Sequence, residues 1–147
     1  MKIAVCWSMV FHKEFEELKS QLDSMGHNTH IPELKLGMTD WNISIRDYLA
    51  TEAKPWEDLT WLWKKKNIAI LDHFRIIEDS DCILVANYEK KWIPWYIGVN
   101  TMLEMWLATY YGKPIYLLDN VPSEIDWMDE IYGMMPSVIN FDLKKII

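Results

Sequence analysis

The chain has 147 residues, of which half are hydrophobic and a quarter charged, and its formal net charge is −7. This composition provides enough apolar residues for a folded core and excludes a disordered chain, and the length predicts a single domain over residues 1–147. The acidic balance argues against a nucleic acid polymer as partner, because binding to phosphates needs a basic surface. We therefore expect a small-molecule ligand.

Both cysteines, Cys6 and Cys82, fall in short apolar runs. This placement favours buried free thiols in a reducing compartment over a disulfide or a metal site. The apolar run over residues 3–11 is too short to span a bilayer and lacks a small-residue cleavage site. The sequence thus predicts a cytoplasmic protein without a membrane anchor, a metal ion or another cofactor.

The first half of the chain predicts strands and helices in alternation. Residues 2–6 form a compact apolar run typical of a strand, and residues 11–25 place apolar side chains at helical spacing until Gly26. A second short strand over residues 28–31 closes at Pro32. The irregular stretch 33–56 contains a predicted short helix over residues 43–53, and Pro55 is expected to open a long helix over residues 57–77.

The second half continues the alternation. Residues 82–86 are continuously apolar, as in a strand covered on both faces, and we expect them at the centre of the sheet. The remaining elements are a loop over residues 87–99, helices over 100–111 and 123–132, and strands over 114–118 and 137–139. Strands separated by such helices predict a doubly wound parallel sheet of about five strands, Rossmann-like or flavodoxin-like, with helices on both faces.

Ligands of such sheets bind beyond the carboxyl ends of the strands, where the strand order reverses. This rule selects residues 7–10, residues 87–99 and the turn after Leu118. Asn100 is predicted as the N-cap of the following helix, with Glu104 about one turn inside. The positive end of the helix dipole would then keep the Glu104 carboxylate ionised, as a nucleophile requires, although spacing alone favours a glutamate that only complements the dipole.

Four segments carry a family resemblance: residues 1–9, 80–88, 96–108 and 112–117. Together they resemble the nucleoside 2-deoxyribosyltransferase-like family over most of the chain except about residues 33–60. The most specific part is the helix start Asn100-Thr101-Met102-Leu103-Glu104-Met105. The resemblance implies that Glu104 attacks the anomeric carbon of a deoxynucleoside, giving a covalent deoxyribosyl-enzyme that a second base or water resolves.

A carboxylate nucleophile of this kind needs an acid that assists the leaving group, as in a retaining glycosidase. The resemblance implies an aspartate as that acid, but its position falls on His73, with Asp72 beside it. A protonated imidazole could deliver the proton, whereas the alternative is a capping or packing histidine. Asp79 and Asp81 are further candidates.

Further candidate ligand contacts lie in the selected loops. Aromatic rings can stack on bases, and a serine with backbone amides after the first strand could hold a phosphate, although a glycine-rich phosphate signature is absent. Half-buried loop aromatics also occur without ligands. The candidates are Trp7, Ser8, Met9, Asn87, Tyr88, Tyr96 and Asn100. The resemblance also implies a homo-oligomer in which a neighbouring chain helps to close each site.

Tryptophan occurs nine times and glycine five times, which is less than half of glycine's average share of about 7%. In the family pattern the positions of Trp7, Trp95 and Trp106 are ordinarily glycine, and Trp41 and Trp92 lie where glycine would be natural. Three explanations stay open. In the first, the protein has diverged and the indoles fill its pocket. In the second, tryptophans were introduced deliberately into a folded scaffold. In the third, the source organism reads the opal codon as glycine, and the codon was translated here as tryptophan.

The leading hypothesis is transfer or hydrolysis of the N-glycosidic bond of 2′-deoxynucleosides or deoxynucleotides through Glu104. The alternative is a non-catalytic nucleotide-binding or sensing domain of the same fold, with a pocket altered by tryptophan at glycine positions. A third hypothesis is hydrolysis restricted to deoxynucleoside monophosphates.

Overall fold

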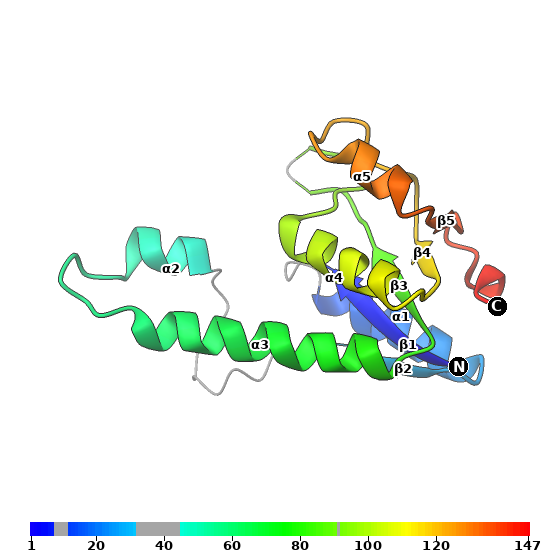
Figure 1. Ribbon diagram of the computed structural model, residues 1–147, viewed down its shortest axis with the longest axis horizontal. Helices are drawn as coiled ribbons and strands as arrows, with labels where there is room; N and C mark the ends of the chain where they lie inside the picture. The colour runs from blue at the N-terminus through cyan, green and yellow to red at the C-terminus, as the bar shows by residue number, and fades with distance from the viewer. Residues whose placement is uncertain (8–11, 32–44, 91) are drawn as a thin grey trace. The chain divides into compact units, whose positions relative to one another are not determined.

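The computed structural model describes residues 1–7, 12–31, 45–90 and 92–147 (Figure 1). The chain divides into two units, one formed by Met1–Pro32 with Phe74–Ile147 and the other by Glu33–His73. The predicted single domain over residues 1–147 stays a prediction. No helix within the described ranges combines the length and the apolar character that a membrane span requires.

The first unit contains a sheet of five strands, all parallel, in the order β2-β1-β3-β4-β5. The strands are β1 (Lys2–Trp7), β2 (Asn28–His30), β3 (Cys82–Ala86), β4 (Ile115–Leu117) and β5 (Ser137–Val138). The predicted α/β class with β3 at the centre is confirmed. The order reverses between β1 and β3, where Trp7 pairs with Ala86, so these two residues mark the switch point.

Side chains alternate across the sheet, as the strand period of two requires. Ile3, Val5 and Trp7 of β1 join one core cluster together with α1 (His12–Ser24). Ala4 and Cys6 join the other cluster, which includes α4 (Val99–Tyr110). Helices thus cover both faces of the sheet, as predicted, and every residue of β3 is buried.

The remaining helices differ in their bounds from the prediction. They are α2 (Ile45–Thr51), α3 (Thr60–Asp79), α5 (Met128–Gly133) and the 3₁₀ helix η1 (Leu143–Lys145). Pro55 does not open the long helix. Instead α3 begins at Thr60, whose backbone N–H and hydroxyl donate to the Asp58 carboxylate over 2.9 and 2.6 Å. The Asp58 side chain thus accepts from one of the backbone N–H groups that have no partner within the helix at a helix start.

The start of α4 also corrects the prediction. The N-cap is Gly98, in extended backbone and without a side-chain cap hydrogen bond, and Asn100 is therefore not the N-cap. A Cβ atom at position 98 would lie 3.2 Å from Cε1 of Tyr96, tighter than most side-chain contacts. The close approach of the Tyr96 ring favours glycine at the cap, and tertiary packing here outweighs the intrinsic preference for asparagine.

Candidate active site

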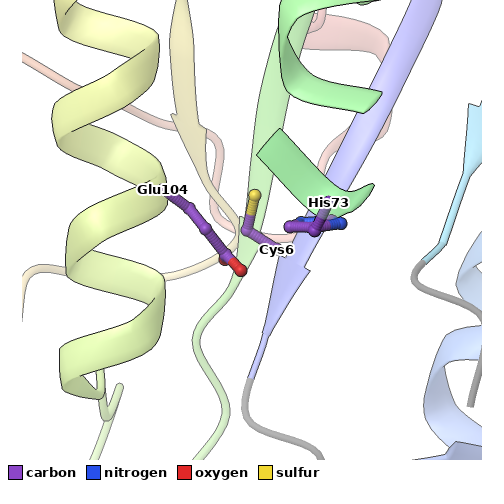
Figure 2. A group of neighbouring side chains, drawn as sticks. All are labelled: Cys6, His73 and Glu104. Carbon is purple, nitrogen blue, oxygen red and sulfur yellow. The ribbon is translucent and has the colours of Figure 1, made fainter. Parts of the chain in front are cut away.

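The site predicted around Glu104 lies on the α4 face of the sheet. Figure 2 shows the Glu104 side chain extending from α4 toward β1, where Cys6 is the residue before the switch point. The Cys6 sulfur and a Glu104 carboxylate oxygen lie within 4.8 Å, and the thiol donates a hydrogen bond to the carboxylate. The strand alternation explains this pairing, since Cys6 faces the same side as Ala4 and α4 covers that side.

Electrostatics keep Cys6 neutral. Complete burial raises the pKa of the Cys6 thiol well above its ordinary value, and the charge of Glu104 and the hydrogen bond to it raise the pKa further. The thiol is therefore a neutral hydrogen-bond donor at neutral pH and not a nucleophile. Glu104 is half-buried as a residue, and its carboxylate oxygen Oε2 is buried.

The helix dipole contributes less to Glu104 than predicted. No acidic residue lies in the first turn of α4, because the helix begins at Val99 and Glu104 is five residues further along. The influence of the dipole falls off within the first turn. The helix end therefore supports an ionised carboxylate less than the prediction assumed, and the hydrogen bond from Cys6 is the interaction that sequence reasoning missed. The alternation of side chains along β1, which places Cys6 on the face that α4 covers, was the sequence feature that could have indicated this hydrogen bond.

His73 and Asp72 lie on α3, in the second unit. Asp72 is exposed, whereas His73 is buried with only 5% of its surface accessible. Burial lowers the pKa of His73 to about 4, so its imidazole is neutral at neutral pH. Figure 2 also draws His73, but it is the last residue of the second unit. Its predicted partnership with Glu104 therefore stays a prediction, as does the role of Asp72.

Asn87 follows β3 and connects two loops. Its side-chain amide donates to the backbone carbonyls of Asp119 and Asn120 over 3.2 and 2.7 Å, and the Asp119 N–H donates to its carbonyl oxygen over 3.0 Å. Both amide hydrogens of this buried side chain are thus used to fasten the turn after β4 beside the end of β3. The structure gives Asn87 a structural role, and its predicted ligand contact stays a prediction.

The two predicted tyrosines lie in different surroundings. Tyr88 packs on the α1 face, with its ring centroid 6.1 Å from that of Phe15 and 6.3 Å from that of Phe141. Glu104 and Cys6 meet on the opposite face. Tyr96 lies in the loop before α4, and the Lys90 ammonium group is 5.3 Å from its ring centroid. The structure therefore does not bring Tyr88 together with Glu104.

The other predicted contacts are not brought together either. The Trp7 indole stacks on Phe15 with centroids 3.9 Å apart and ring planes 16° apart, which places it in the core on the α1 face. Asn100 is exposed in the first turn of α4. Ser8 and Met9 lie outside the described residues. The ligand contacts proposed for these residues stay predictions.

No family model matches the chain, and no curated protein sequence matches it significantly. Among solved structures, the 2-deoxyribosyltransferase from Bacillus psychrosaccharolyticus is similar with a TM-score of 0.51 and 15% identity, over 94% of this chain and 98% of that one. A conserved protein from Enterococcus faecalis V583 is similar with a TM-score of 0.56 and 15% identity, over 95% of this chain and 90% of that one. At this identity the similarity shows a common α/β fold.

Proposed function

We propose that the chain transfers or hydrolyses the N-glycosidic bond of 2′-deoxynucleosides or deoxynucleotides through a covalent intermediate on Glu104. The observation that carries the proposal is Glu104, a half-buried residue whose carboxylate accepts a hydrogen bond from the Cys6 thiol beside the switch point of the sheet. The fold similarity to a 2-deoxyribosyltransferase and the residues around Glu104 support it. A homo-oligomer in the cytoplasm is part of the same proposal.

The Cys6 thiol suits a nucleophilic carboxylate. A thiol is a weak hydrogen-bond donor, so it orients one carboxylate oxygen without withdrawing as much charge as an ammonium or guanidinium group would. The second oxygen attacks C1′ as the bond from C1′ to the base nitrogen breaks, and the base leaves with that electron pair and takes up a proton. Water or a second base then attacks C1′ and releases the carboxylate, with overall retention.

The proton donor to the leaving base stays a choice between His73 and a nearby aspartate such as Asp72. A 7-methyl-2′-deoxyguanosine substrate separates leaving-group protonation from bond cleavage, because its base already carries a positive charge. We expect the variant that lacks the donor, H73N or D72N, to lose activity on 2′-deoxyadenosine and to retain it on the cationic substrate. Equal loss on both substrates would show that the residue does not protonate the base.

The main experiment incubates the protein with 2′-deoxynucleosides and a free base and separates the products by chromatography. E104Q and E104A should abolish exchange and hydrolysis, and acid quenching followed by peptide mass spectrometry should find deoxyribose on Glu104 in the parent protein. E16Q is the matched control, since Glu16 is exposed on α1. A well-folded parent that neither exchanges nor hydrolyses any 2′-deoxynucleoside would reject the proposal.

The alternative function is binding without turnover. The neutral His73 favours it, because a pKa of about 4 leaves few imidazolium donors at neutral pH. Calorimetric titration with deoxynucleosides and deoxynucleotides distinguishes the two. Binding of the parent and of E104Q with similar affinity, without product from either, supports a sensing domain.

A further inference from the structure

The loop between β3 and α4 contains a tight hairpin turn. Lys90 and Ile93 form an antiparallel bridge in which each backbone N–H donates to the other's carbonyl over 3.0 Å. The turn between them therefore has two residues, and Trp92 is the second, with φ of 67°. Two-residue hairpin turns favour positive φ and place glycine, asparagine or aspartate there, because a Cβ atom opposes this conformation.

A second tryptophan of the same loop shares this conformation. Trp95 has φ of 57°, and the next N–H, of Tyr96, donates to the Tyr88 carbonyl over 3.1 Å as the chain folds back on itself. Positive φ is uncommon for any residue other than glycine, and for a bulky side chain it is an outlier. Within the described ranges the tryptophans with positive φ are these two.

Packing of the indole does not account for Trp92, whose surface is 90% exposed. Other tryptophans of the chain have evident roles. The Trp127 indole N–H donates to the Ile97 carbonyl over 3.2 Å, and Trp61 meets the Tyr48 ring edge-on with centroids 5.8 Å apart. Trp92 differs from these two tryptophans because it combines positive φ with an exposed indole.

We infer that positions 92 and 95 are glycine positions, and that the polypeptide for which this loop was selected carries glycine at both. The inference accounts for the loop geometry, and glycine at both positions would change the nine tryptophans and five glycines of the chain to seven of each. Of the three explanations for the tryptophans, reading of the opal codon as glycine places glycine at both positions without an exchange in the gene. The tryptophan form is then a strained version, and the activity assays above need the W92G/W95G variant beside it.

Mass spectrometry of the protein isolated from its source organism is the first test. Cleavage after glutamate, at Glu89 and Glu104, releases residues 90–104 as one peptide that contains positions 92 and 95. Fragment masses that give glycine at 92 and 95 support the inference. Tryptophan at either position overturns it there, whatever activity the protein has, so its failure is distinct from failure of the proposed function.

The second test measures the backbone preference in recombinant protein by denaturant unfolding. Glycine at 92 or 95 should exceed alanine at the same position by about five- to thirtyfold in the folding equilibrium constant, since the left-handed conformation opposes any Cβ atom. Trp56 is the control, an exposed tryptophan outside the positive-φ set, and there alanine should equal or exceed glycine. Alanine matching glycine at 92 and 95 would overturn the geometric argument.

Discussion

Replacing His73 tests whether burial keeps the imidazole neutral. Folding lowers the pKa of His73 from 6.5 to about 4, so between these two pH values the imidazole is protonated in the unfolded chain and neutral in the folded chain. The stabilisation is fully present above the unfolded pKa and is lost as pH falls from about 6.5 toward about 4. The shift of 6.5 − 4, or about 2.5 units, corresponds to about 3 kcal/mol at 1.36 kcal/mol per unit.

Urea unfolding of the parent and of H73Q at several pH values between about 7 and 4 isolates this contribution. The other ionisable groups are the same in both proteins, so the difference between the two curves belongs to His73. We expect the parent to lose about 3 kcal/mol more than the variant over this range. Parallel curves would contradict the reasoning.

An NMR titration of the parent's imidazole C–H resonances needs no variant and checks the same quantity. The resonance that is missing in H73Q belongs to His73, and a midpoint near 6.5 for it would show that His73 is solvated. A midpoint near 4 would also mean that an imidazolium donor serves catalysis only in acid. Activity through His73 should then decline as pH rises above about 4.

Two further predictions concern the sheet. Burial, and next the charge of Asp81, raise the pKa of Cys82 from 9.0 to about 11, so the stability that the protonated thiol contributes is lost as pH rises from about 9 to about 11. In urea unfolding over this pH range, C82A should lose about 2 kcal/mol less than the parent. Equal losses would contradict this. N87L removes the hydrogen bonds to Asp119 and Asn120 and should cost about 2–4 kcal/mol, whereas N100A on the exposed face of α4 should change stability by at most about 0.5 kcal/mol. Similar costs for N87L and N100A would show that the bridge between the loops contributes little.

The strands were the most predictable part of the fold. Residues 82–86 match β3 because a continuous apolar run is what a strand buried on both faces requires. Helix starts were less predictable, since several residues near each start can cap it. At α4 the close Tyr96 ring favours Gly98 as the N-cap, and at α3 the hydrogen bonds from Thr60 to the Asp58 carboxylate start the helix after Pro55. Such decisions depend on neighbours in space.

The candidate site was predictable only in part. Glu104 could be singled out by resemblance, but its hydrogen bond to Cys6 joins residues nearly one hundred positions apart and follows from the register of β1 against α4. The resemblance named the positions of Trp7, Trp95 and Trp106 as glycine positions, and the loop context added Trp41 and Trp92. The sequence did not give the backbone angles, which among the described tryptophans are positive at Trp92 and Trp95, because conformation at a turn depends on the hydrogen bonds that close the turn.

The Glu104–Cys6 pair is an arrangement that stability alone does not favour. Moving a carboxylate from water toward a core costs free energy that a weak thiol donor offsets only in part, whereas an apolar side chain at position 104 would pack against the same strand without that cost. Neighbouring positions 102, 105 and 108 of α4 are apolar and buried, as expected of a helix on a sheet. A departure from that pattern at the switch point, where this fold class binds ligands, is what the proposed role of the carboxylate would require.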